Sequence, residues 1–336
     1  MVDALSIVQT TLSHFPAGAK TRCWLDVMPG MSQPVRAPLV VARGNEAGPT
    51  LMAVAGVHGD EYEGMEAIRR VFDRIDPHGL RGTFAGIPVA NPFAYEARAR
   101  VAPRFVDGLN LARMFPGNPD GTSSAVLADR LFGFITRNLG PSDLFIDFHS
   151  GSADVAYATI AGVRATRGPA RAASEAAARH FGLSRLWEIP DARGPLNAET
   201  TRAGIPTIGT ETTGRAGFDA GGCAAFATGL MRLLAFMGMI NDHVPEPETG
   251  PFRPTTDALS PGTGYLRGAA RLYDEVDKGQ SLGTIVDVFG EVVVEVTAPV
   301  SGTVWAARAM CAVRNGEIMC SIARSASDDG SREDGR

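Results

Sequence analysis

The segment "VHGDEYEG", residues 57–64, joins two stretches of opposite character. It follows the apolar run "TLMAVAGV", residues 50–57, which is typical of a buried strand, and it leads into "MEAIRRVFDRI", residues 65–75, whose apolar residues recur at helical spacing. A strand, a short turn and a helix form the first part of a β-α-β unit. The turn carries one histidine and three acids, and a chemical role would explain this crowding.

The same alternation continues through the first two thirds of the chain. Strand-like runs occupy residues 37–44, 50–57, 82–91, 143–150, 155–162 and 205–212, and helical stretches occupy residues 63–75, 124–139, 168–182 and 220–240. Alternating strands and helices favour a sheet covered by helices on both faces. We therefore predict an α/β domain over residues 1–245, built on a mainly parallel, mixed sheet. In such sheets, functional residues gather at the carboxyl ends of the strands.

The pattern changes after residues 241–264, which are rich in Pro, Thr and Gly. Two later segments, "VDKGQSLGTI" at 276–285 and "VRNGEIMCSI" at 313–322, share the pattern V-x-x-G-[QE]-x-[LM]-x-x-I. A duplicated strand-turn-strand unit resembles the small all-β domain of lipoyl and biotinyl carriers, and we predict such a domain over residues 246–325. A carrier needs a lysine at its hairpin tip, where this chain has Glu291. The predicted role is therefore structural or that of a lid.

The charge of the chain and the composition of its ends indicate which partners and which cellular location to expect. The formal net charge is −5 and the lysines are Lys20 and Lys278 alone, which argues against nonspecific nucleic-acid binding. The N-terminus has Asp3 where a signal peptide would be basic, and Arg232 interrupts the most apolar later stretch. We expect a cytoplasmic protein without a membrane or nucleic-acid partner. Whether it forms a homo-oligomer stays open, and the polar tail, residues 326–336, is predicted to be disordered.

The cysteines give no metal or disulfide framework. The four cysteines contain no CxxC pair. Cys311 and Cys320 flank "NG" at residues 315–316, a hairpin signal that predicts these two thiols opposite each other on neighbouring strands. In a reducing cytoplasm we expect free thiols there.

His58 and Glu61 are candidate metal ligands. His58 follows the predicted strand and Glu61 comes three residues later, as the helix begins, so both side chains can turn toward one point. An imidazole and a carboxylate suit Zn(II), which accepts nitrogen and oxygen ligands. The alternative interpretation is that the acids complement the positive end of the helix and that His58 is an ordinary loop histidine.

A second strand end strengthens the metal interpretation. "DLFIDFHSG", residues 143–151, is an apolar run that delivers His149 at its carboxyl end. Three protein ligands with a fourth position open to water are typical of catalytic zinc. Asp147, two residues earlier, would point to the same side of the strand and orient a ligand from behind.

Five motifs together resemble a known family. "GVHGDEYEG", "NPFAYEARAR", "DGLNLARMFPG", "DFHSG" and "IGTETTG" follow the order and approximate spacing of the succinylglutamate desuccinylase/aspartoacylase family, a branch of the zinc carboxypeptidase superfamily. The resemblance covers about residues 30–325. It implies a zinc carboxypeptidase-like fold and a zinc-dependent amidohydrolase, with one Zn(II) per chain, that cleaves the amide of an N-acyl amino acid through a zinc-activated water.

The resemblance also implies roles for individual residues. His58, Glu61 and His149 match the metal ligands, and Glu211, in "TETTG", matches the catalytic acid. A carboxylate beside the activated water can take its proton and later pass it to the leaving amine. The alternative for Glu211 is a salt-bridged acid at a strand end.

Two arginines match as well. Arg100 corresponds to the residue that helps polarise the scissile carbonyl, with Arg98 and Arg104 as nearby alternatives. Arg113 corresponds to the residue that binds a substrate carboxylate, for which the planar guanidinium is suited.

The sequence departs from the family pattern next to Arg113. Many members carry an asparagine where this chain has Ala112, so an amide that would assist carboxylate binding is missing. Asn110 is the predicted substitute. The departure leaves hydrolysis intact and the substrate undefined.

Three functions are consistent with the sequence. The leading hypothesis is the deacylase, acting on a small N-acyl amino acid. A metallocarboxypeptidase that acts on peptide C-termini needs the same groups and is the first alternative. The second is a non-catalytic metal- or ligand-binding protein.

Overall fold

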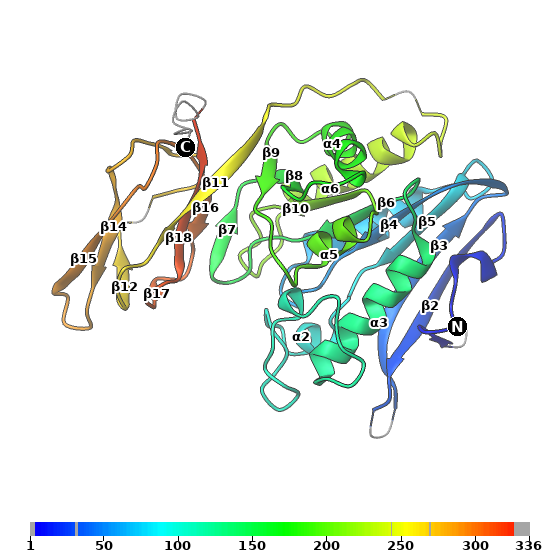
Figure 1. Ribbon diagram of the computed structural model, residues 1–336, viewed down its shortest axis with the longest axis horizontal. Helices are drawn as coiled ribbons and strands as arrows, with labels where there is room; N and C mark the ends of the chain where they lie inside the picture. Colours follow the sequence, from blue (N-terminus) through cyan, green and yellow to red (C-terminus); the bar gives the residue numbers. More distant parts are fainter. Residues whose placement is uncertain (1–3, 31–32, 243, 269, 326–336) are drawn as a thin grey trace, which may run out of the picture.

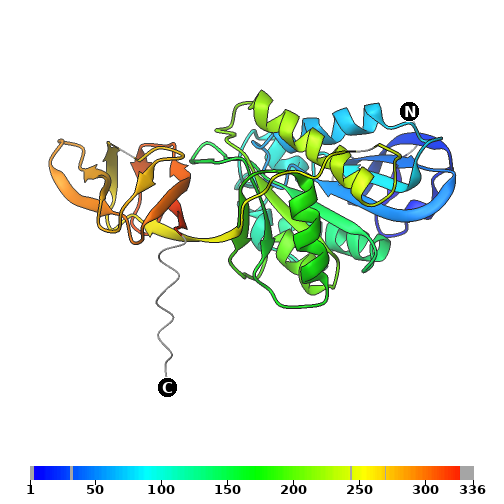
Figure 2. The same ribbon diagram turned by 90° about the horizontal axis from the view of Figure 1, so that it is seen from above.

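The computed structural model describes residues 4–30, 33–242, 244–268 and 270–325. The molecule is elongated, and its C-terminal strands form one end (Figure 1). Helices lie on both sides of the sheet in the other part (Figure 2). Within the described ranges, no helix is both long and apolar enough to cross a membrane. The tail predicted to be disordered, residues 326–336, lies outside the described residues.

The α/β part contains ten strands and their intervening helices in chain order. The strands are β1 (Leu5–Ser6), β2 (Ala19–Met28), β3 (Val35–Arg43), β4 (Glu46–Val54), β5 (Arg81–Ile87), β6 (Leu144–Phe148), β7 (Val155–Tyr157), β8 (Ile160–Arg164), β9 (Leu186–Ile189) and β10 (Thr207–Glu211). The α-helices are α1 (Glu63–Arg74), α2 (Pro92–Glu96), α3 (Ser123–Asn138), α4 (Ala170–Phe181), α5 (Leu196–Arg202) and α6 (Ala220–Phe236). Two 3-10 turns are η1 (Leu12–His14) and η2 (Leu111–Arg113).

The main sheet is mixed, with a parallel centre. Its order begins β1-β2-β3-β5-β4-β6-β10-β8-β9. Strands β5, β4, β6 and β10 run parallel, whereas β3 and β8 pair antiparallel with their neighbours β5 and β10. The predicted mixed sheet with flanking helices is confirmed. The prediction omitted β1, β2 and β9. Strands β1 and β9 are only two and four residues long, whereas the polar and apolar alternation in β2 is a strand signal that was not used.

Each face of the sheet has its own apolar core. Helix α1 shows how the sequence builds one of them, because Met65, Ile68 and Phe72 recur at helical spacing and are buried against the sheet. Helices α4 and α6 share this core, and α3 packs on the opposite face. The helices therefore hold the central strands in place from both sides.

Strand β11 (Phe252–Leu259) connects the two parts of the molecule. It pairs parallel with β9 and antiparallel with β18 (Ile318–Arg324), so the sheet continues from the α/β part into the C-terminal strands. The remaining strands are β12 (Gly264–Arg267), β13 (Glu275–Val276), β14 (Ser281–Val286), β15 (Val292–Thr297), β16 (Gly302–Arg308) and β17 (Ala312–Val313). The sequence analysis described residues 241–264 only as rich in Pro, Thr and Gly, assigned no strand to them and so missed β11. The domain limits at 245 and 325 stay predictions.

The two copies of the sequence repeat adopt the same local structure. Each copy is a short strand, a turn and a longer strand, as β13 and β14 in the first and β17 and β18 in the second. The shared glycines, Gly279 and Gly316, both have a positive φ, at 85° and 82°, which other residues adopt only with strain. A second sheet, β15-β14-β12-β17, faces the end of the first. The comparison with lipoyl and biotinyl domains stays a prediction.

The hairpin prediction for Cys311 and Cys320 is wrong. The strands that follow and precede the "NG" turn belong to different sheets, since β17 pairs with β12 while β18 pairs with β11 and β16. Cys311 is exposed and Cys320 is buried, and both are free thiols. The turn therefore links two sheets rather than two paired strands. Glu291 follows the turn between β14 and β15, near the hairpin tip where a carrier would have its lysine.

Candidate active site

Three neighbouring parallel strands place the candidate residues at one edge of the sheet. Strands β4, β6 and β10 are adjacent, and their register pairs Val54 with Asp147 and Phe148 with Thr210. Their carboxyl ends are therefore level. His58 follows β4 by four residues, His149 follows β6 directly, and Glu211 is the last residue of β10. The fold brings together residues that lie up to 153 positions apart in the sequence.

The "NP" motif holds the turn that carries His58. The side-chain oxygen of Asn91 accepts a hydrogen bond from the Ala94 amide at 3.1 Å, which caps α2, and its nitrogen donates to the Val57 carbonyl at 3.3 Å. Gly59 lies so close to α2 that a Cβ atom there would be 2.1 Å from the carbonyl carbon of Ala94. The glycine and the asparagine together fix the main chain on both sides of His58.

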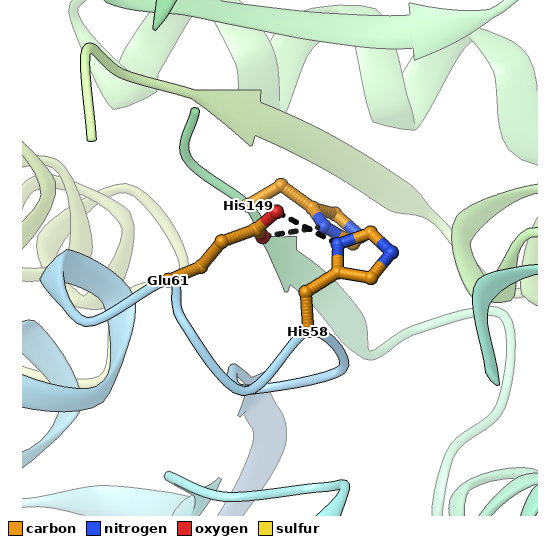
Figure 3. A group of neighbouring side chains, drawn as sticks. All are labelled: His58, Glu61 and His149. Atoms are coloured by element: carbon orange, nitrogen blue, oxygen red, sulfur yellow. Dashed lines mark hydrogen bonds and ion pairs between the residues drawn. The ribbon is translucent and has the colours of Figure 1, made fainter. Parts of the chain in front are cut away.

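His58, Glu61 and His149 form a compact candidate metal site. One ligand atom from each lies within 4.8 Å of the others. The Nδ1 atoms of His58 and His149 lie 2.7 Å and 3.0 Å from the two carboxylate oxygens of Glu61. Figure 3 shows the carboxylate directed at both rings. The predicted ligand set is thus brought together, while its binding of a metal stays a prediction.

Several donors besides the histidines hold Glu61. Its carboxylate accepts hydrogen bonds from Arg100 at 2.9 Å, from the Ser152 hydroxyl at 3.0 Å and from the Ser150 amide at 3.2 Å. Burial opposes the charged form, but His58 and His149 outweigh it and lower the pKa of Glu61 well below its ordinary value. Glu61 is therefore an anionic acceptor. The sequence analysis missed the two serines, although they lie one and three residues after His149.

The hydrogen bonds of His58 show that the site fits a cation. The Nε2 atom lies 3.1 Å from Oδ1 of Asn110, an oxygen that already accepts a hydrogen bond from the Ala112 amide. Nδ1 faces Glu61, which is also an acceptor. A neutral imidazole has one N–H and can serve only one of these acceptors, and burial lowers the pKa of His58 and so disfavours a second proton. A metal ion bound at Nδ1 removes the conflict.

His149 has the same arrangement. Its Nδ1 atom faces Glu61, and its Nε2 atom lies 3.4 Å from Oδ2 of Asp147. Burial opposes the charged ring, yet Asp147 and Glu61 raise the pKa of His149 well above its ordinary value. A carboxylate behind a histidine is the usual partner of a metal-bound imidazole. The position of Asp147 thus agrees with its predicted role of orienting a ligand, and two imidazoles with a carboxylate suit Zn(II).

Glu211 is a half-buried acid that no protein group neutralises directly. Within the described part of the chain, its Oε2 atom is buried and has no hydrogen-bond partner. Burial raises the pKa of Glu211 to about 8, although the nearby His149 acts in the opposite direction. The salt-bridged alternative for Glu211 receives no support, because none of the ion pairs among described residues includes it. A carboxyl with such a pKa is suited to move protons near neutral pH.

The two other acids of the opening segment have different surroundings. Glu63 is fully buried, and its carboxylate accepts hydrogen bonds from the Ser150 hydroxyl at 2.6 Å and from the Asp219 amide at 2.7 Å. It therefore ties α1 to the loop after His149 and to the start of α6. Asp60 is buried, with a long contact of 3.4 Å from the Ala153 amide. The crowding of acids thus combines a candidate ligand with a structural anchor.

The predicted arginines reach the same cavity. A cavity of about 340 Å³ is lined by His58, His149 and Glu211 together with Arg100 and Arg113. Arg98 and Arg104, the alternatives to Arg100, do not line it. The guanidinium of Arg113 donates to the Ala112 carbonyl at 2.9 Å, and among the described residues no carboxylate pairs with it. Burial and the neighbouring Arg100 lower the pKa of Arg113. The cavity therefore contains a positive charge that the protein itself does not neutralise.

Further residues of the cavity wall were not found from the sequence. They are Tyr157, Arg164, Trp187, Asn197, Asp257 and Ser321. They come from six different elements, so no local motif connects them. Asn197 also contacts a predicted site residue. Its main-chain amide donates a hydrogen bond to Asp147 at 3.1 Å, and its side-chain oxygen accepts one from Arg164 at 2.7 Å.

Fold and site together define a class of protein. A histidine, a glutamate and a second histidine gather beside another carboxylate at the carboxyl edge of a mixed α/β sheet, an arrangement suited to metal-dependent hydrolysis. Residues 47–237 match the family model described as the succinylglutamate desuccinylase/aspartoacylase catalytic domain. The chain belongs to this family, and the resemblance noted from its motifs is confirmed.

Several relatives extend the match along the chain. The N-alpha-acetyl-L-2,4-diaminobutyric acid deacetylase of Halomonas elongata is 30% identical over 302 residues, which is 86% of each chain. The product-bound structure of the ectoine utilization protein EutE (DoeB) from Ruegeria pomeroyi has a TM-score of 0.82 at 26% identity and covers 93% of this chain and 98% of that one. A succinylglutamate desuccinylase/aspartoacylase from Rhodobacter sphaeroides gives 0.79 at 26% identity, with 91% and 96% covered. The similarity to these relatives supports the interpretation that the protein is an enzyme that acts on amide bonds.

Proposed function

We propose that the protein is a zinc-dependent deacylase that hydrolyses the amide bond of an N-acyl amino acid. The observation that carries the proposal is the shared cavity, which is lined by both histidines of the His58–Glu61–His149 cluster, by Glu211 with its unpartnered Oε2 atom and by Arg113. These groups supply, in order, a metal site, a proton carrier and a carboxylate-binding cation.

The candidate ligands and Glu211 have separate roles in the proposed reaction. Zn(II), held by His58, Glu61 and His149, would supply a Lewis acid that polarises a carbonyl and acidifies water. Glu211 accepts the proton of the attacking water and delivers it to the nitrogen of the leaving amine. Burial raises its pKa to about 8, which suits both steps near neutral pH.

The arginines orient the substrate. Arg113 binds the α-carboxylate through its planar guanidinium. Arg100 donates to Glu61 and to the Ser152 hydroxyl, which places its charge at the candidate metal site, where it can stabilise negative charge on the amide oxygen. We propose that Asn110 acts on the substrate through its amide nitrogen, since its oxygen is used by His58 and Ala112.

A substrate panel tests the proposal. The relative from Halomonas is named as a deacetylase of N-alpha-acetyl-L-2,4-diaminobutyric acid, so this compound heads a panel of N-acetyl and N-succinyl amino acids, with dipeptides as the competing class. We expect hydrolysis of an N-acyl amino acid and none of the dipeptides. Preferred cleavage of dipeptides would establish the metallocarboxypeptidase instead. Metal-free protein without hydrolysis of either class, even after zinc is added, would favour a non-catalytic binding protein.

A further inference from the structure

Two residues of the C-terminal strands form part of the wall of the cavity. Asp257 on β11 is paired with Ser321 on β18 in the sheet register, and both line the same cavity as His58 and His149. The Ser321 hydroxyl donates to Oδ1 of Asp257 at 2.6 Å. The strands that carry them are separated by 58 residues of sequence, between Leu259 and Ile318. The serine fixes the carboxylate, which remains exposed to the cavity.

The charge of Asp257 is not used within the protein. Its carboxylate accepts a hydrogen bond from Ser321 at Oδ1, and in the described ranges no lysine, arginine or histidine pairs with it. The cavity is otherwise rich in arginine, with Arg100, Arg113 and Arg164 in its wall. An anion kept separate from these cations gives the cavity two charged regions of opposite sign.

Asp257 lies within electrostatic range of the reaction centre. The pKa of the buried Tyr157 hydroxyl is raised by burial and, in addition, by Glu211 and Asp257, while Arg100 acts against them. Tyr157 also acts on the pKa of Arg113. Glu211, Arg113, Tyr157 and Asp257 all line the same cavity. A single small molecule can reach the proton carrier, the carboxylate-binding arginine and Asp257.

The wall beside Asp257 is suited to a short aliphatic side chain. Thr255 precedes Asp257 by two residues on β11, so both side chains lie on the same face of the strand. The Trp187 indole donates to the Thr255 hydroxyl at 3.1 Å, which places an aromatic surface next to the carboxylate. Aromatic surface favours both methylene groups and cations.

We infer that the amino acid released by this enzyme carries a short cationic side chain, and that Asp257 is the residue that binds its ammonium group. The inference rests on the proposed deacylase function and names its substrate class. Arg113 binds the carboxylate at one end and Asp257 binds the ammonium at the other, with the amide between them at the candidate metal site. The cavity, at about 340 Å³, lies at the small end of the range for ligand sites, which suits a small substrate.

Binding of the product amino acid tests the inference without requiring turnover. The probes are L-2,4-diaminobutyrate and L-norvaline, which have side chains of equal length ending in an ammonium and a methyl group. Calorimetry on the full, zinc-supplemented chain should show binding of diaminobutyrate at least about tenfold tighter than that of norvaline. Asp257→Asn keeps the size of the side chain and should remove most of this difference. Asp277→Asn, the same change at an exposed residue outside the cavity, should preserve it.

The outcomes separate this inference from the proposed function. Equal binding of the two probes by the wild type, or an unchanged preference in Asp257→Asn, would overturn the inference. Hydrolysis of the N-acetyl derivatives is measured in parallel, and Asp257→Asn should lower kcat/KM for the diaminobutyrate derivative by about tenfold or more and that for the norvaline derivative by less than about threefold. If neither derivative is hydrolysed while the Asp257-dependent preference persists, the deacylase proposal fails and the cation site stands.

Discussion

The side-chain oxygen of Asn110 contacts His58 and caps η2 at the same time, with the Nε2 atom of His58 3.1 Å away. Residues that orient metal-binding histidines affect metal affinity although they do not touch the metal. The contact links the candidate metal site to the segment that carries Arg113. It gives Asn110 a testable role beyond the substrate binding predicted from the sequence.

Asn110→Ala should weaken zinc binding by about tenfold to a hundredfold, because His58 loses the acceptor that fixes its Nε2 proton. Competition with a chromogenic chelator measures the affinity. Asn118→Ala, an exposed asparagine in the next turn, serves as the control. Unchanged zinc affinity together with a raised KM would leave Asn110 with a substrate role alone.

His149→Ala should lose most of the bound metal, since the substitution removes one of three candidate ligands. It also removes one of the partners that compensate the negative charge of Glu61. The zinc content of protein purified without added metal, measured by mass spectrometry, should be close to one per chain in the wild type. The exposed His78→Ala is the matched control and should retain it. Full zinc occupancy in His149→Ala would refute the ligand assignment.

Glu211→Gln should lower kcat by roughly a hundredfold to ten-thousandfold, the usual consequence of losing a positioned acid-base group. The amide keeps the size of the side chain but cannot carry the proton. Steady-state kinetics and zinc content are measured on the same sample. Retained activity would assign the proton transfer to another carboxylate, with Asp60 the first to examine, whereas loss of zinc would identify Glu211 as a ligand.

The same variant should change how the stability of the metal-free protein depends on pH. Burial raises the pKa of Glu211 from its ordinary value of 4.5 to about 8, so the folded state keeps a proton that the unfolded chain releases. The wild type therefore loses stability as pH rises from 4.5 to 8, by linkage. Glu211→Gln lacks this loss. The free energy of unfolding of the variant minus that of the wild type should therefore be larger at pH 8 than at pH 5 by at least about 1 kcal/mol, measured by urea denaturation after chelation.

The exposed Glu295→Gln provides the reference for that measurement. It should follow the wild type at both pH values, because no buried charge changes. A Glu211→Gln curve parallel to that of the wild type would show that the carboxyl of Glu211 titrates normally.

Arg113→Ala should raise KM by about tenfold to a hundredfold for a substrate with a free α-carboxylate, since the guanidinium has no competing carboxylate among the described residues. Zinc content should not change. Arg104→Ala, outside the cavity, is the control. Equal KM values for a substrate and its methyl ester in the wild type would show that no carboxylate is bound.

Local sequence was sufficient to propose the candidate ligands, although their binding of a metal stays a prediction. His58 and His149 follow strands whose pattern is readable, Glu61 comes three residues after His58, and parallel strands end at a common edge. The strand that ends at Glu211 was predicted as well, whereas the role of Glu211 came from the family motif. The contact between Asn110 and His58 was not predictable, since it depends on the path of an irregular segment between α2 and η2.

Strand β11 was missed for a different reason. Its proline and threonine residues look like those of a linker, and its pairing partners β9 and β18 lie far away in sequence in opposite directions. Pairing over such distances leaves no periodic signal in the strand itself. The contribution of Asp257 and Ser321 to the cavity depends on that pairing and was therefore hidden too.

The course of β11 through both parts of the molecule has a consequence for how such an enzyme can change over time. The proposed chemical groups stand on β4, β6 and β10, while Asp257 and Ser321 stand on strands outside that set. Substitutions on β11 and β18 can alter which side chain is accepted without displacing the proton carrier or the metal ligands. Selectivity can thus diverge among descendants of one ancestor while the reaction stays the same.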